Sequence, residues 1–195
     1  MASPSRADST RDRIIDAATA EFARYGIAGA RIDRIAKAAA TSKERVYAHF
    51  RGKAELYRFI AARELDAVAE ATQLDPADLP GYAGRVHDYF LAHPDRRRLM
   101  RWGQLEGVEA DESARVTGRR KVAMVHRAQQ DGLLEASWDP LDVVVFVSQL
   151  ASAWADQPEL PSVAGQTREQ FLAHRRAALV AAVQRLFPAA DTATV

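Results

Sequence analysis

The residues with the clearest chemistry in this sequence form one short run that mixes cations, a carboxylate and apolar side chains. Lys43 and Arg45 carry N–H donors that can bond guanine O6 and N7 in the major groove of DNA, and Glu44 can accept from cytosine N4. Val46 and Phe50 are four residues apart, so in a helix they share one face and leave the polar side chains on the surface. This run predicts a short helix that can lie in a major groove.

A helix and a turn precede this run and are expected to position it. Four apolar residues recur with the spacing of one helical face: Ile32, Ile35, Ala36 and Ala39. Thr41-x-x-Glu44 has the spacing of a capping box, in which a hydroxyl and a Glu side chain close the first turn of a helix. The sequence therefore predicts two short helices joined by a tight polar turn, with Thr41 at the start of the second.

The order of these positions resembles the DNA-binding domain of the TetR family of transcriptional regulators, over roughly residues 1–60. The positions that match the family pattern are Phe22, Gly26, Ile32, Ile35, Ala36, Ala39, Ser42, Val46, Tyr47, His49, Phe50, Lys53 and Leu56. The sequence departs from it at Arg31, Thr41, Ala40 and Glu44-Arg45. Ala40 replaces a turn glycine, which indicates either a turn that needs no left-handed residue or a turn that tolerates a small strain.

The resemblance implies an all-α protein with a three-helix helix-turn-helix domain, which binds a palindromic double-stranded DNA operator as a homodimer. It implies DNA contacts from the turn, the second helix and the start of the next one: Arg31, Ser42, Lys43, Glu44, Arg45, Tyr47, His49 and Lys53. Tyr47, His49 and Lys53 match family positions that touch the phosphate backbone. Glu44 and Arg45 stand where bases are contacted, so the resemblance does not identify the operator sequence.

The distribution of charge agrees with a polyanionic partner. The 195-residue chain has a net charge of +1, yet residues 1–60 hold 12 Lys and Arg against 7 Asp and Glu, whereas residues 61–195 hold 15 against 19. A basic N-terminal third is the electrostatic pattern of DNA binding. The sequence has no cysteine, no apolar run as long as a membrane span and no signal-peptide core, so we expect a cytoplasmic protein that does not associate with membranes.

Helical periodicity continues through the rest of the chain. The expected helices span residues 10–25, 53–72, 79–92, 95–108, 111–131, 139–156 and 167–187, with loops at Gln73–Gly81 and Gln157–Gly165. Gly26 should end the first helix, and Thr167-x-x-Gln170 is a capping box for the last. The expected organisation is a disordered arm at 1–9, a helix-turn-helix domain at 10–58, a helical ligand-binding and dimerisation domain at 59–188 and a tail at 189–195.

Two late helices carry more apolar surface than one protomer is expected to cover. Asp142–Ala155 is apolar almost all round, and residues 171–187 carry a second wide apolar face. The valines at residues 143–147 have β propensity, but the length of the apolar segment and the Asp139-Pro140 pair before it favour a helix. In the TetR family the last two large helices pair with their copies, so the resemblance implies a dimer interface here. The alternative is ordinary packing within one chain.

Enzyme chemistry is not indicated. The five histidines lack metal-ligand spacing, and the sequence contains no GxSxG, no Gly-rich phosphate loop and no cysteine nucleophile. We therefore expect no catalytic residue, no metal and no cofactor.

Aromatic and polar side chains within the later apolar faces are candidates for a small-molecule site, because such sites combine mostly apolar walls with a few polar groups. The candidates are Phe90, Trp102, Gln104, Met124, His126, Phe146, Gln149 and Trp154. Each of them alone is more often a core residue than a ligand contact. The prediction is a DNA-binding repressor that a small-molecule effector releases from its operator. A helical interaction module and a ligand-independent regulator of the same fold are the alternatives.

Overall fold

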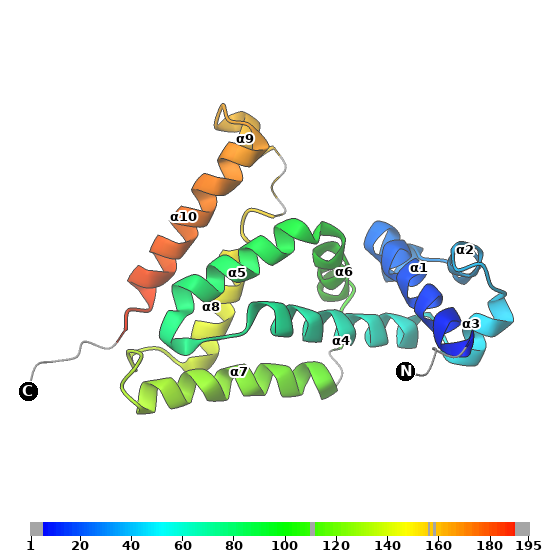
Figure 1. The fold of residues 1–195 in the computed structure, drawn as a ribbon, viewed down its shortest axis with the longest axis horizontal. Coiled ribbons are helices and arrows are strands. Elements are labelled where there is room, and N and C mark those ends of the chain that lie inside the picture. Colours follow the sequence, from blue (N-terminus) through cyan, green and yellow to red (C-terminus); the bar gives the residue numbers. More distant parts are fainter. Residues whose placement is uncertain (1–5, 110–111, 156, 158, 190–195) are drawn as a thin grey trace, which may run out of the picture. The chain divides into compact units, whose positions relative to one another are not determined.

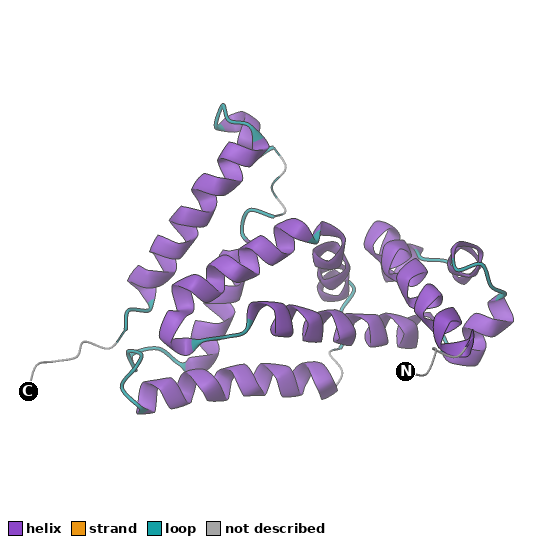
Figure 2. Ribbon diagram, in the orientation of Figure 1, coloured by secondary structure: helices purple, strands orange, loops and turns teal. Residues whose placement is uncertain are grey.

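The computed structural model describes residues 6–109, 112–155, 157 and 159–189, and this part of the chain is almost entirely helical (Figure 2). It contains ten α-helices, one 3-10 helix and no strand, with an isolated β-bridge between Leu134 and Ala189. The predicted all-α class is confirmed. Of the arm expected at residues 1–9, residues 1–5 lie outside the described ranges and the first helix begins at Arg6. Of the tail expected at 189–195, residues 190–195 also lie outside them.

The chain folds into two compact units. The first comprises residues 1–66 and 93–114, and the second comprises residues 67–92 and 115–195. The division falls inside α4 (Lys53–Thr72) and again inside α7 (Glu112–Gln130). The first unit therefore takes one helix, α6 (Pro94–Leu105), from the middle of the sequence.

The first unit combines α6 with α1 (Arg6–Gly29), α2 (Ile32–Ala38), α3 (Lys43–His49) and the first part of α4 (Figure 1). These helices share one hydrophobic core, and the long side chains that are fully buried in it are Ile14, Phe22, Ile35, Val46, Leu56, Ile60 and Leu99. Ile32, Ala36 and Ala39 are also buried, which confirms the expected apolar face of α2. The most extensive helix pair is α1 with α6.

Gly26 interrupts α1 where the sequence predicts the helix to stop. Its backbone has φ 69° and ψ −177°, a conformation that only glycine adopts readily, and the turn Ile27–Gly29 follows. The carbonyl of Gly26 accepts from the N–H of Ala30 at 3.2 Å, so this last turn closes separately from the main helix. The break turns the chain toward α2.

The turn between α2 and α3 differs from the expected one. Ser42 is the N-cap of α3, because its hydroxyl accepts from the Arg45 N–H at 3.2 Å; the capping box expected at Thr41 and Glu44 is wrong. An N-cap lies directly before the first helical residue, which is Lys43 here, so Thr41 is one residue too early. Ala40 has φ 49°, so the strained turn is the correct one of the two interpretations.

The second unit is built around α5 (Leu79–Ala92), which packs against α8 (Pro140–Ser152) and α10 (Arg168–Leu186). The buried apolar side chains of this unit include Leu79, Tyr82, Val86, Val125, Val143, Val147, Leu179, Val183 and Phe187. The bounds of α5 coincide with the expected helix at residues 79–92, and the Val-rich run forms α8, a helix as predicted.

Local capping signals set the helix ends of the second unit. Asp139 caps α8 by accepting from the Leu141 N–H at 2.7 Å. Thr167 and Gln170 exchange two hydrogen bonds of 3.2 Å each, which confirms the predicted capping box of α10. Both expected loops contain a short helix, η1 (Pro76–Asp78) and α9 (Leu160–Val163), because each has a proline in the first turn, where no N–H is needed.

Candidate functional site

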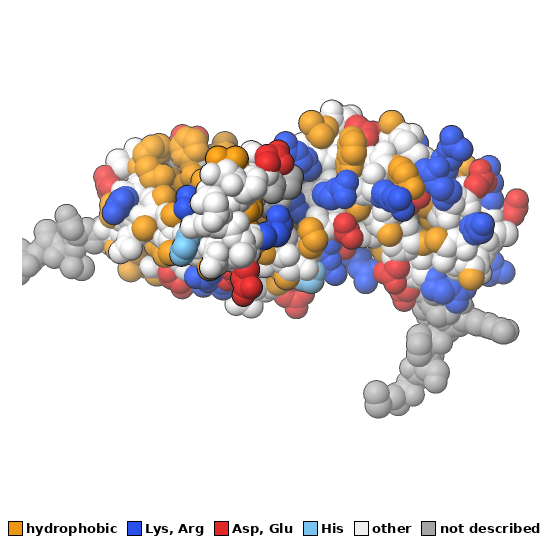
Figure 3. All heavy atoms as spheres, turned by 90° about the horizontal axis from the view of Figure 1, so that it is seen from above, with side chains coloured by type: hydrophobic (Ala, Val, Ile, Leu, Met, Phe, Trp, Pro, Cys, Tyr) orange, Lys and Arg blue, Asp and Glu red, His pale blue; other side chains and the backbone are white. Residues whose placement is uncertain are grey.

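The outer face of α3 presents the residues that the sequence predicted for base contacts. Val46 is buried at 1% exposure, whereas Lys43, Glu44, Arg45 and Tyr47 are exposed. Figure 3 shows Lys and Arg side chains spread over the part of the molecule that carries α1 to α3, mixed with fewer acidic ones. The structure therefore brings these four polar side chains together on one solvent-facing helix.

Two of these side chains are already held by neighbours. Lys43 Nζ lies 3.0 Å from Asp33 Oδ1 of α2, and this hydrogen-bonded ion pair raises the pKa of Lys43. The Glu44 carboxylate accepts from its own backbone N–H and from the Ser42 hydroxyl, and both interactions lower its pKa. Arg45, in contrast, makes no side-chain hydrogen bond or ion pair with the described part of the chain. Arg45 is therefore the cation of α3 that is ready to bind an external acceptor.

The remaining predicted contacts lie at the two ends of this surface. Arg31 precedes α2 with an extended backbone and an exposed side chain, and Ser42 is exposed at the start of α3. His49 is half-buried in the last turn of α3. Lys53 begins α4, and its Nζ donates to the carbonyl oxygens of Ala28 at 2.9 Å and Ala30 at 3.2 Å. Lys53 thus has a structural role that its position in the sequence did not indicate.

Sequence reasoning also missed two carboxylates that fix the connection between α1 and α2, residues 26–31. Glu21, at 9% exposure, accepts from the Arg31 N–H at 2.9 Å and from Arg34 Nε at 2.7 Å. Glu106, at the end of α6, accepts from the N–H groups of Ile27 and Ala28 at 2.8 Å each. The Glu106 contacts span 79 and 78 residues, so no local pattern could have revealed them.

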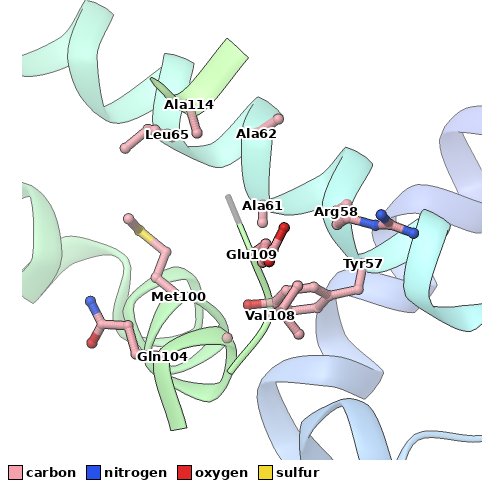
Figure 4. A pocket seen from close by; sticks show the side chains of 11 residues that line it. Tyr57, Arg58, Ala61, Ala62, Leu65, Met100, Gln104, Val108, Glu109 and Ala114 are labelled. Carbon is pink, nitrogen blue, oxygen red and sulfur yellow. The ribbon is translucent and has the colours of Figure 1, made fainter. Parts of the chain in front are cut away.

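A cavity of about 170 Å³ lies beside these elements, between α4 and α6 of the first unit (Figure 4). Its walls are mostly apolar, and its lining residues are Tyr57, Arg58, Ala61, Ala62, Leu65, Met100, Gly103, Gln104, Val108, Glu109 and Ala114. The Tyr57 and Met100 side chains point into the space between the two helices, and Arg58 points away from it. For comparison, an engineered apolar cavity of roughly 150 Å³ holds benzene.

Tyr57 is one of the polar residues that line this cavity. It is 2% exposed, and its hydroxyl donates to the Leu99 carbonyl of α6 at 2.8 Å. Burial raises the pKa of Tyr57 to about 12, and the negative charge of Glu106 adds to the rise. A hydrogen bond with the backbone of Gly103 acts in the opposite direction and lowers the pKa, so the hydroxyl is held by α6 at two points, Leu99 and Gly103.

The structure does not gather the eight residues predicted for a small-molecule site. Gln104 lines the cavity, whereas Trp102 packs against α1, where its Nε1 donates to the Ala23 carbonyl at 3.2 Å. The other six lie in the second unit. Phe90 is buried there against Tyr89, Trp154 lies edge to face with Phe171, and Met124 is half-buried; His126, Phe146 and Gln149 are exposed on their helices.

Other kinds of site are not seen in the described residues. No group of three or more His, Asp or Glu side chains there could hold a metal ion. None of the described helices combines the length and the apolar character that crossing a membrane requires.

Comparison with known proteins identifies the family to which this chain is similar. Residues 14–60 match the family model for bacterial regulatory proteins of the tetR family, and residues 78–185 match the tetracyclin repressor-like C-terminal domain. A curated relative, the HTH-type transcriptional repressor SCO4008 of Streptomyces coelicolor, is 38% identical over 152 residues, which are 76% of this chain and 79% of the relative.

Similar solved structures agree with these family matches. The crystal structure of SCO4942 from Streptomyces coelicolor, described as a transcriptional regulator, is 53% identical with a TM-score of 0.82, and the match covers 92% of this chain and 98% of that one. A tetR-family structure from Shewanella sp. PV-4 is 19% identical with a TM-score of 0.68, over 92% and 98% of the two chains, and supports the fold alone. The chain therefore belongs to the TetR family, and it is a DNA-binding transcriptional regulator of that family.

Proposed function

We propose that this regulator is a repressor that binds a palindromic operator as a homodimer and leaves it when a small apolar effector binds. The observation that carries the proposal is the exposed polar face of α3, which stands on a buried apolar face and presents Arg45 without an internal partner. The relative SCO4008 is named a transcriptional repressor, which supports the direction of control. Such a protein acts in the cytoplasm, where the DNA is.

The DNA contacts divide by chemistry. Arg45 is placed to bond guanine, since an Arg can reach O6 and N7 together. Lys43 and Glu44 are secondary base contacts, because each must first give up an internal partner. Five further residues bind the phosphate backbone and set the register of α3 in the groove: Arg31, Ser42, Tyr47, His49 and Lys53. Lys53 does so with the third N–H of its ammonium group, because the other two donate to Ala28 and Ala30. We assign DNA binding to residues 10–58, and dimerisation to the helical region at 59–188.

The dimer interface is formed by α8 and α10. On α8, Val143 and Val147 face the core, whereas Leu141, Val145 and Phe146 remain 55%, 43% and 42% exposed. On α10 three of the exposed residues are the small Ala173, Ala177 and Ala178, and a second helix can approach closely at these positions. Exposed apolar surface of this kind is typical of an interface, and Figure 3 shows apolar side chains gathered on the second unit.

The effector site is the cavity between α4 and α6. Its volume and its walls suit a neutral molecule of roughly the size of a substituted benzene ring. Gln104 and Glu109 are lining residues that offer polar groups to a bound molecule. These features favour an uncharged, mainly apolar effector with one or two hydrogen-bonding groups.

Selection from a randomised DNA duplex library tests the function. We expect enrichment of an inverted repeat whose half-site centres are about 10–10.5 base pairs apart or a multiple of that spacing, with binding that weakens steeply as salt rises. A helical interaction module would enrich no sequence.

A library of neutral aromatic compounds tests the effector. The compounds are screened first for a thermal shift of the protein and then for release of the enriched duplex from it. A regulator without an effector would give neither response.

A cavity-filling variant provides the control for the effector screen. Ala61 lines the cavity from α4, and Ala61→Leu adds three carbons to that wall. This variant should keep its affinity for the enriched duplex and lose the thermal shift that wild type shows. Compounds that still shift the variant bind elsewhere, and that result would remove the cavity from the proposal.

A further inference from the structure

Glu106 makes an unusual pair of contacts for a residue at the C-terminal end of a helix. Its two carboxylate oxygens accept from two successive backbone N–H groups, Ile27 and Ala28, each at 2.8 Å. These N–H groups directly follow Gly26, where the helical geometry of α1 is interrupted. Hydrogen bonds from N–H to a carboxylate are charge-assisted and shorter and stronger than neutral ones.

The contact depends on a close approach of α6 to α1. A Cβ placed on Gly26 would lie 2.5 Å from Glu106 Oε1 and 2.9 Å from the Trp102 ring, so only glycine fits between the helices. Trp102 holds the same approach from one turn earlier, through its bond to the Ala23 carbonyl. Gly26, Trp102 and Glu106 therefore form one joint, which we call the α1–α6 joint.

The α1–α6 joint holds residues 26–31, the connection between α1 and α2, through the bonds of Glu106 to Ile27 and Ala28. The conformation of this connection determines where α2 begins. Within residues 26–31, Lys53 binds two carbonyls, Arg34 binds the Gly29 carbonyl at 2.8 Å and Glu21 binds the Arg31 N–H. Each of these three partners lies in the helix-turn-helix part of the sequence. Glu106 is the member of this set that reaches the connection from a helix outside it.

We propose that Glu106 is a positioning residue for DNA binding. Its carboxylate fixes residues 27 and 28, these fix the start of α2, and α2 packs directly against α3. Glu106 thus sets the orientation of the polar face of α3 without contacting DNA. The inference rests on the proposed operator binding. It adds α6 to the helices that control this binding.

The same helix forms one wall of the cavity. Met100, Gly103 and Gln104 of α6 line it, while Trp102 and Glu106 face α1. A ligand that displaces α6 therefore pulls on the α1–α6 joint directly. This gives the proposed effector a short route to α2 that stays within the first unit.

Glu106→Gln tests the proposal because two explanations predict opposite signs. Removing a negative charge from a DNA-binding unit should strengthen its attraction to DNA if long-range electrostatics are all that matter. Loss of the positioning contact should instead weaken binding to a duplex that wild type has selected from a randomised library, by roughly 10-fold, since a charge-assisted bond contributes about that factor. Binding to a scrambled duplex of equal length should stay the same or tighten.

Asp95→Asn is the matched control on the same helix. Asp95 is exposed in the first turn of α6 and lies far along the helix from Glu106, so its change removes the same charge without touching the joint. This variant should bind both duplexes as well as wild type or slightly better. If Glu106→Gln behaves like Asp95→Asn on the selected duplex, the proposal is overturned.

Hydrogen exchange separates positioning from a general loss of folding. In Glu106→Gln the amides of Ile27 and Ala28 should exchange faster, while core amides such as that of Ile35 keep the wild-type rate. If Glu106→Gln melts below the assay temperature, Trp102→Phe provides the same test, because it removes the bond to Ala23 and keeps an aromatic ring. Wild-type affinity in a folded Trp102→Phe would then count against the joint. Failure of wild type to enrich any duplex would instead refute the proposed function.

Discussion

The outer face of α3 and the outer face of α8 are both exposed, but they are exposed for opposite reasons. On α3 the exposed side chains are polar, and several have internal partners, as Lys43 has in Asp33. On α8 the exposed side chains Leu141, Val145 and Phe146 are apolar, while other positions of the helix pack against α5 and α10. The first face suits a charged and hydrated partner, and the second suits a dry interface with a copy of itself.

This difference predicts different responses to mutation. Polar contacts on α3 exchange water or an internal partner for DNA, so each should contribute a moderate amount to affinity. An apolar interface excludes water, so a charge placed inside it should have a large effect. The comparison can therefore be tested by the size of the effect as well as by its sign.

Val145→Asp should have the largest effect. An aspartate at this position would be buried and unpaired in a dimer, which costs about 3–5 kcal/mol, and the protein should become monomeric at micromolar concentration. Light scattering after size-exclusion chromatography measures the mass. Val163→Asp is the control, because Val163 is 78% exposed and belongs to α9, which is not one of the two helices of the proposed interface. A wild-type monomer, or a dimeric Val145→Asp, would contradict the interface. Val183 is unsuitable for this test because it is 0% exposed within one chain.

Arg45→Ala should have the next largest effect, on the first face. Loss of a bidentate guanine contact costs about 1–3 kcal/mol on the selected duplex and much less on random DNA. Lys43→Ala should cost less than Arg45→Ala on the selected duplex, because Lys43 must first leave Asp33. Fluorescence anisotropy with both duplexes measures the affinities. Equal losses on selected and random DNA would identify Arg45 as a phosphate contact.

Ser42→Ala should destabilise the first unit by about 1 kcal/mol, since removal of an N-cap hydroxyl usually costs about that amount. Thr41→Ala should leave stability almost unchanged, because Ser42 is the residue that accepts from the Arg45 N–H. Urea unfolding of the two variants gives the free energies of unfolding. Equal losses of stability in the two variants would show that Ser42 is not the residue that caps α3.

The last effect concerns Tyr57 and is absent at neutral pH, because it appears only at high pH. Its pKa of about 12 in the folded state lies above the ordinary value of 10, so the unfolded chain loses this proton first. The contribution of Tyr57 to stability is therefore fully present below pH 10 and is lost as pH rises from 10 to 12. Thermal melts across this range should show a steeper decline for wild type than for Tyr57→Phe. Parallel curves would contradict the burial of this hydroxyl.

Local patterns in the sequence determined much of the fold. The apolar spacing of α2, the capping box at Thr167 and Gln170, and the Asp-Pro start of α8 each act within one or two helical turns, so they can be read from neighbouring residues. The order of apolar, turn and basic positions identified the helix-turn-helix. The same patterns placed the cap of α3 one residue too early, because Thr41 and Ser42 both carry a suitable hydroxyl and only the backbone decides between them.

The tertiary structure alone decided which side chains work together. Periodicity marked α8 as apolar all round, but only packing against other helices, α5 and α10, separates Val143 and Val147 from the exposed Val145. Lys53 binds carbonyls 25 and 23 residues away, and Glu106 binds amides 79 and 78 residues away. The cavity likewise joins α4 to α6 and includes one of the eight side chains that composition favoured. Such contacts depend on how helices distant in sequence pack, and no spacing within a single helix records that.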